Sequence, residues 1–263
     1  MKHFILILVL VFALEPSIHS QKLETKFTNS FLLHADIFIG IDEFENLYYI
    51  KDNTFFKKSV QGTVNYTNLS LGKITSVDIH NPFKIVLFYQ DYNSAIVLDN
   101  KLNELTDKID FTGNTLFNNV QLVSHSSENN LWLFADDNKL HLYNFQNSTE
   151  KIQTQPITFY QPNFIPISLK STYKNAWVVG NTGVIQINEY GNFINFYKNE
   201  DIDFISPYLK GFIYMKNRSF FYVENNNIIQ VLIEFDHSLA DIYINNSSIN
   251  IFDGAKVHRY IIL

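Results

Sequence analysis

The sequence predicts an all-β fold, and more specifically a single β-propeller with six four-stranded blades. Runs of large apolar residues that end in Asp or Asn recur along the chain at a spacing of about forty residues, the length of a propeller blade. No stretch shows a sustained helical period. Hydrophobic residues make up 46% of the chain, which is enough to fill a packed core.

The segment Asn129–Asn147 shows the repeating unit most clearly. In an extended strand, Leu131 and Leu133 fall on one face, whereas Trp132 and Phe134 fall on the other. A strand that is apolar on both faces must be covered on both faces. The Asp and Asn residues that follow favour a turn, because they tolerate left-handed backbone and bond to their own backbone. Equivalent runs end at Asp52, Asp91, Asp136, Asn181, Asn217 and Asn246.

Each unit also shows a gradient of polarity along the chain. In the third unit, Val120–Val123 alternates, Trp132–Ala135 and Leu140–Tyr143 are mainly apolar, and Lys151–Thr154 is more polar. This order predicts a half-buried strand, two buried strands and an exposed edge strand, as in a blade between two neighbours. A two-sheet β-sandwich is the alternative fold, but it does not call for a repeated unit that ends in Asp or Asn.

Residues 1–20 have the pattern of a signal peptide. Lys2 supplies positive charge, Phe4–Leu14 is an unbroken apolar run, and a polar region precedes Gln21. The run is shorter than the roughly 20 residues that a membrane anchor needs, and no later segment reaches that length. We therefore expect an exported protein of the periplasm or cell envelope, with one propeller domain over residues 21–263 and no integral membrane span after signal removal.

Closure of the ring can also be anticipated. A ring of blades that stayed open would leave an unpaired strand edge, which native proteins cover. Part of residues 21–40 could pair with the last blade, around Val257–Leu263, and so close the ring.

Two segments in the first half of the chain, Phe38–Ser59 and Asn81–Leu105, resemble uncharacterised exported β-propeller-like proteins of flavobacteria. The resemblance implies a propeller and a bacterial envelope address. It brings no defined catalytic motif, and it therefore implies little about activity.

The sequence offers little that points to chemistry. Cys is absent, which excludes disulfides, thiol nucleophiles and Cys metal ligands. The histidines, His237 and His258 among them, are scattered, and no two lie at ligand spacing on one short element. We interpret them as edge or surface residues; the alternative is a metal site assembled from distant loops. The carboxylate clusters Asp42–Glu45, Asp136–Asp137 and Glu200–Asp203 lack the Gly of a calcium loop and are interpreted as solvated turns. We predict no catalytic, cofactor-binding or metal-binding residues and no cofactor.

These observations favour a non-enzymatic, exported protein-binding or scaffold module in the bacterial cell envelope. The formal net charge of −6 argues against a nucleic-acid partner, and an envelope protein is the expected one. The alternatives are a glycan-active hydrolase or lyase, or a sugar-binding module, that uses the propeller face. Trp132 and Trp177 occupy equivalent positions in successive units, so they are either inter-blade packing or a platform for sugar rings.

The repeated turn residues are the candidate partner face. In a propeller the turns between the second and third strands of all blades emerge on one side. A partner could dock there through charge complementarity. The alternative is that these residues only satisfy turn geometry. The predicted face consists of Asp52, Asp91, Asp136, Asp137, Asn181, Asn217 and Asn246.

Overall fold

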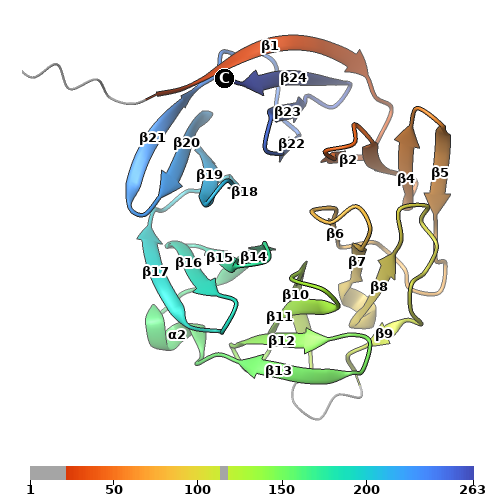
Figure 1. The fold of residues 1–263 in the computed structure, drawn as a ribbon, viewed down its shortest axis with the longest axis vertical. Coiled ribbons are helices and arrows are strands. Elements are labelled where there is room, and N and C mark those ends of the chain that lie inside the picture. The colour runs from red at the N-terminus through yellow and green to blue at the C-terminus, as the bar shows by residue number, and fades with distance from the viewer. Residues whose placement is uncertain (1–21, 113–117) are drawn as a thin grey trace, which may run out of the picture.

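The structure is a computed structural model that describes residues 22–112 and 118–263, in which six four-stranded blades form a ring (Figure 1). Blade 1 consists of β2 (Ile37–Ile41), β3 (Leu47–Lys51), β4 (Thr54–Ser59) and β5 (Gly62–Tyr66), and blade 2 of β6 (Ser76–Asp78), β7 (Ile85–Tyr89), β8 (Ser94–Leu98) and β9 (Ile109–Asp110). Blade 3 consists of β10 (Val120–His125), β11 (Asn130–Ala135), β12 (Leu140–Asn144) and β13 (Thr149–Gln153), and blade 4 of β14 (Pro166–Ser171), β15 (Asn175–Gly180), β16 (Gly183–Asn188) and β17 (Phe193–Lys198). Blade 5 consists of β18 (Phe204–Tyr208), β19 (Gly211–Lys216), β20 (Ser219–Glu224) and β21 (Asn227–Leu232), and blade 6 of β22 (Asp241–Ile244), β23 (Ser248–Phe252), β24 (Lys256–Ile262) and β1 (Lys22–Leu32).

Helix is almost absent from the described residues. The one-turn segments η1 (Gln90–Tyr92) and α2 (Ile157–Tyr160) are the helical elements there. Within this part of the chain, no helix has the length and apolar character to cross a bilayer. The predicted propeller with six four-stranded blades is therefore confirmed, and the sandwich alternative is not.

The core is divided among the interfaces between neighbouring blades, which explains the segment that is apolar on both faces. Leu131 and Leu133 of β11 pack in a cluster with residues of blade 2. Trp132 and Phe134 of the same strand pack in a cluster with residues of blade 4. Each face of a middle strand thus fills a different interface, whereas the outer strand β13 alternates between exposed and half-buried residues.

The N-terminal strand closes the ring, as predicted. Strand β1 runs antiparallel to β24, from the pair Thr25–Ile262 to the pair Leu32–Lys256, as the outermost strand of blade 6 (Figure 1). Its first residues also pair in parallel with β21 of blade 5, beginning at Lys22. A strand from the start of the domain therefore joins the last two blades and covers the edges of both β21 and β24.

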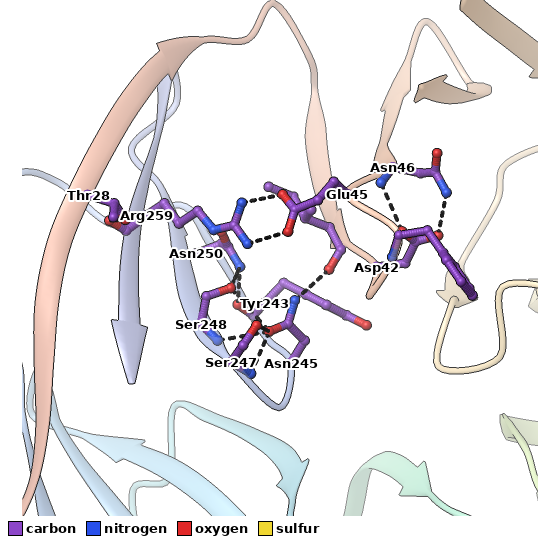
Figure 2. Close-up of polar contacts among 12 residues, drawn as sticks. Thr28, Asp42, Glu45, Asn46, Tyr243, Asn245, Ser247, Ser248, Asn250 and Arg259 are labelled. Atoms are coloured by element: carbon purple, nitrogen blue, oxygen red, sulfur yellow. Dashed lines mark hydrogen bonds and ion pairs between the residues drawn. The ribbon is translucent and has the colours of Figure 1, made fainter. Parts of the chain in front are cut away.

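Polar contacts reinforce the seam between blades 6 and 1, as Figure 2 shows. Asn245 Nδ2 donates to the carbonyl oxygen of Ile41 at 3.1 Å. The Arg259 guanidinium forms a two-pronged ion pair with Glu45, whose pKa is held below its usual value mainly by the hydrogen bond from Arg259. Glu45 is largely exposed, so this pair contributes little stability by itself.

The alternation of strand directions gives the disc two distinct faces. Face A carries the turns between second and third strands together with the connections between blades. Face B carries the turns between first and second strands and those between third and fourth strands.

Candidate functional site

The turn residues that the sequence singled out lie on face A, with one exception. Asp52, Asp91, Asp136, Asp137, Asn181 and Asn217 all follow the second strand of blades 1 to 5. Several of them serve the turn itself: Asp52 and Asn217 have a φ of 49°, and Asn181 Oδ1 accepts a hydrogen bond from the Ile165 backbone N–H at 2.9 Å. These contacts favour a role in turn geometry.

The position expected for Asn246 was wrong. The run that ends at Asn246 forms β22, the innermost strand of blade 6, so Asn246 lies in the turn between first and second strands on face B. Its side chain donates to Glu43 Oε1 at 3.0 Å. The equivalent turn of blade 6 holds Asp253, which follows β23. The inner strand was mistaken for a middle strand because its buried residues, Ile242 and Ile244, give it the same apolar character.

Both tryptophans are packing residues. Trp132 is 0% and Trp177 is 1% exposed, and each lies in the core cluster between two blades. Neither indole can form a platform for a sugar ring. The sequence left this choice open, and burial decides it in favour of packing.

The turn at Asp42 is not the solvated loop that the sequence suggested. Asp42 is 3% exposed, and its carboxylate accepts hydrogen bonds from the Asn46 backbone N–H and side chain (Figure 2). It also accepts from the Phe44 backbone N–H and the Tyr48 hydroxyl. The carboxylate therefore fixes the turn between β2 and β3. Its acceptor positions are used by these four donors, which explains why the turn tolerates burial.

A small cavity of about 90 Å³ lies at the centre of the ring, among the inner strands of five blades. Asp78 is the carboxylate that lines it, within the part of the chain that the structure describes. Its oxygens accept from the His80 and His125 backbone N–H groups and the Ser124 hydroxyl. Burial would raise the pKa of Asp78, but His80 and these hydrogen bonds hold the pKa below its usual value. A single carboxylate that accepts three hydrogen bonds does not form the acid–base pair that a glycan hydrolase needs.

A buried histidine between two carboxylates stands at the outer part of blade 3. His141 is fully buried, with Nδ1 at 2.5 Å from Glu150 Oε1 and Nε2 at 3.0 Å from Asp137 Oδ1. Each ring nitrogen of His141 thus faces one carboxylate oxygen. Burial would raise the pKa of Asp137, but the hydrogen bond and charge of His141 hold that pKa below its usual value. This arrangement ties the face A turn of blade 3 to its outer strand.

We expect Asp137→Asn to lower the free energy of unfolding by about 1–3 kcal/mol near pH 6, because a charge-assisted hydrogen bond is lost. The pKa of Asp137 is lower in the folded than in the unfolded chain. Its stabilising contribution is therefore present above the unfolded pKa of about 3.9 and is lost as the pH falls through the folded pKa. Urea denaturation across pH 3 to 6 should show the variant approaching wild type at the acid end. Asp91→Asn, at an exposed turn, is the control. A loss of unfolding free energy in Asp137→Asn that does not change with pH would contradict this role.

The structure brings together three groups that sequence reasoning missed. His237 lies in the connection between β21 and β22, Asp253 in the turn between β23 and β24, and His258 in β24. Their ligand-type atoms all lie within 4.8 Å of one another. The short spacing of Asp253 and His258 across one turn could have indicated that these two side chains meet. His237 lies beside them only because of the path of the inter-blade connection.

Face B carries large apolar side chains at the tips of four of its six turns between first and second strands. These residues, with their exposed fractions, are Phe44 (61%), Phe83 (55%), Tyr173 (64%) and Leu209 (64%). At the six equivalent turns of face A, Tyr92 is the one exposed large hydrophobic residue among those described. Face A does carry exposed apolar residues in its inter-blade connections, such as Leu69 and Phe159. The apolar turn tips therefore mark face B, not the face that the sequence suggested.

Two recesses open on face B beside these tips. One, of about 590 Å³, is lined by His80, Tyr173, Lys174, Leu209 and Lys210, with neighbouring residues. The other, of about 420 Å³, lies between blades 1 and 2 and is lined by residues that include Phe44, Lys57, Val60, Phe83 and Lys101. Both recesses combine apolar surface with lysine side chains.

The lysines of the recesses differ in their contacts with the rest of the chain. Lys101, Lys174 and Lys210 form no ion pair with another described residue. Lys57 lies at the wall of the recess between blades 1 and 2, where its Nζ donates to the Asn100 carbonyl at 2.7 Å. Burial lowers the pKa of Lys57 from its usual value. Lysines therefore lie beside Tyr173 and Leu209 and in the recess of Phe44 and Phe83, although Phe44 itself stands between the exposed Glu43 and Glu45.

Comparison with known proteins supports the fold and no particular activity. No protein-family model and no curated protein matches the sequence. Among solved structures, the chain resembles virginiamycin B lyase from Staphylococcus aureus at 12% identity and a TM-score of 0.59, over 91% of this chain and 100% of that one. It also resembles a streptogramin B lyase (12% identity, TM-score 0.56, 85% and 78% of the two chains) and U3-55K (11%, 0.57, 85% and 77%). Likeness at this level of identity shows a shared propeller fold.

Proposed function

We propose that this chain is a non-enzymatic, exported β-propeller that binds a protein partner in the bacterial cell envelope through face B. One observation carries the proposal, namely the exposed apolar tips at four of the six turns between first and second strands. Exposed apolar side chains beside a recess are typical of protein-interaction sites, and here two tips lie beside each of two recesses. The signal-peptide pattern of residues 1–20 supports export.

The chemistry of the recesses indicates the kind of segment that binds. Tyr173 and Leu209 offer apolar contact area, and Lys174 and Lys210 lie next to them in sequence and in the same recess. A partner segment that alternates acidic and large apolar side chains matches this surface. The charges would act mainly on association rate and specificity, and the apolar contacts would supply the affinity.

The enzyme and sugar-binding alternatives gain no support from a specific observation. The central cavity lacks a carboxylate pair among its described residues, and both tryptophans are buried. The face A residues Asp91 and Asp136 remain an alternative partner surface, and a charge reversal at both distinguishes that surface from face B.

The test is selection of binders from a peptide library displayed on phage. We expect enriched peptides that combine acidic with aromatic or aliphatic residues. Their affinity should fall at least about tenfold for Tyr173→Ser combined with Leu209→Ser. Lys174→Glu combined with Lys210→Glu should slow association and weaken binding at low salt. The matched control is Phe159→Ser, which removes an exposed aromatic residue on face A.

Several outcomes would reject this face. Selection that yields no binders contradicts the proposal, as do selected peptides that bind the face B variants as tightly as wild type. Peptides that lose affinity only for Asp91→Lys combined with Asp136→Lys would place the partner on face A instead. Export is tested on protein from its own host, where terminal sequencing should read a start near Gln21; Met1 retained on a cytosolic chain would contradict it.

A further inference from the structure

We propose that His237, Asp253 and His258 form a binding site for one divalent transition metal of the zinc class, which fastens the connection between blades 5 and 6 to blade 6. Two imidazoles and one carboxylate make a donor set that zinc accepts, with the remaining position open to water. The site lies on face A, away from the proposed partner surface, and its role is independent of that proposal.

The three donors come from segments that the fold holds at a common point. His258 lies in β24, which is paired on both sides, with Ile251 of β23 and with Ser30 of β1. Asp253 is oriented by its own turn, because its Oδ1 accepts from the Ala255 and Lys256 backbone N–H groups. Its Oδ2 is thereby left for a different partner, and it lies 2.7 Å from His258 Nε2.

The three side chains lie where a cation can reach them. All three side chains are half-buried, so they are shielded from bulk water yet open to an ion from solution.

Metal binding requires a rearrangement in which the ion replaces the hydrogen bond between His258 Nε2 and Asp253 Oδ2. The rings of His237 and His258 are stacked, with centroids 3.7 Å apart and planes at 13°. Because a metal lies in the plane of each imidazole that binds it, two parallel rings cannot share one ion. His237 must therefore rotate out of the stack, and the ligand atoms must close to about 2.0–2.2 Å from the ion. The connection from Ile233 to Ala240 contains no strand and can absorb this rotation.

The surroundings define the competing interpretation, in which the cluster holds the connection without a metal. Arg218 donates to the His237 carbonyl oxygen at 2.7 Å, and its guanidinium lies 4.6 Å from the centre of the Phe235 ring. His237 Nε2 also lies 3.2 Å from the Tyr260 hydroxyl. Of the charged groups nearby, Arg218 would oppose a bound cation, whereas Asp236 in the same connection would favour it.

The experiment is calorimetric titration of the tag-free protein with zinc chloride, with magnesium chloride as the control, since imidazole ligands suit zinc and not magnesium. We expect one zinc ion per chain, no heat with magnesium, and a thermal midpoint that rises by several degrees with excess zinc. The zinc affinity of His258→Ala should fall by more than about 10–100-fold, which is the loss when a residue that only hydrogen-bonds to a metal ligand is removed. Cobalt in place of zinc should give an absorption spectrum that reports nitrogen ligands.

A second variant distinguishes the loss of a zinc ligand from the loss of folding. His237→Phe keeps a ring that can stack on His258 but removes the donor nitrogens, so it should fold normally and bind zinc weakly. His80→Ala, which removes an exposed histidine on face B, should bind zinc as wild type does. Wild-type zinc affinity in His237→Phe, or no zinc binding by the wild-type chain, would overturn the proposal. A loss in His80→Ala equal to that in His258→Ala would assign the zinc to surface histidines and overturn it as well.

Discussion

Trp132→Ala is expected to lower the free energy of unfolding by about 3–5 kcal/mol, the cost of a large cavity in a packed core. The side chain is fully buried in β11, within the cluster that fills the interface of blades 3 and 4. Leu140 on the same blade and Leu169 and Val178 on the next share this cluster. Strands can relax little around such a void, because their ladders fix the backbone on both sides.

Chemical denaturation of Trp132→Ala measures this cost, and two variants calibrate it. Tyr190→Ala removes an exposed aromatic side chain and should change stability by less than about 0.5 kcal/mol. Trp177→Phe should cost less than Trp132→Ala, because it removes an indole N–H that is buried without a hydrogen-bond partner among the described residues. Unchanged stability of Trp132→Ala would show that the blades 3 and 4 interface is not packed as described.

The architecture could be predicted because the alternation of apolar residues along a propeller strand indicates which of its faces are buried. Alternation such as Leu131 and Leu133 against Trp132 and Phe134 requires cover on both faces, and repetition of that pattern implies a ring of such strands. The prediction failed locally at Asn246, because an inner strand with buried Ile residues looks like a middle strand. Blade position depends on neighbours that lie far away in sequence.

The candidate sites could be predicted much less well, for a different physical reason. Phe44 and Leu209 sit at turn tips, where one exposed side chain has no periodic partner to reveal its direction. His237 meets His258 only because a connection between blades folds back over β24. Such contacts depend on the path of irregular segments, and side-chain periodicity says nothing about that path.

The second large effect is expected at the closing strand. Removal of residues 22–32 should leave a chain that does not fold cooperatively, because the edges of β24 and β21 lose their partner. Apolar contacts are lost as well, since Leu23 packs against the core between blades 5 and 6 and Phe31 against the core between blades 6 and 1. Both interfaces of blade 6 are weakened at once. The combined loss should approach the about 5–15 kcal/mol by which a whole domain is stable.

A circular permutant tests whether the ring needs the pairing of β1 with blades 5 and 6, wherever β1 stands in the chain. Thr25 pairs with Ile262 and the Leu263 N–H donates to the Glu24 carbonyl oxygen, so β24 and β1 already form two arms of an antiparallel hairpin. Lys22 lies beyond that pair by about 7–10 Å at the rise of a strand, so a linker of about six Gly and Ser residues can join Leu263 to Lys22. The new chain would begin at Leu33. We expect it to fold to within about 2 kcal/mol of the parent, whereas the same permutant with a scrambled 22–32 segment should behave as the deletion does. Circular dichroism, size-exclusion chromatography and urea denaturation distinguish these cases.

A deletion variant that unfolds cooperatively at the parent's midpoint would show that blade 6 holds its place without β1. Loss of folding in the permutant, with the deletion also unfolded, would mean that the order of strand addition, and not the pairing of β1 alone, is what the ring requires.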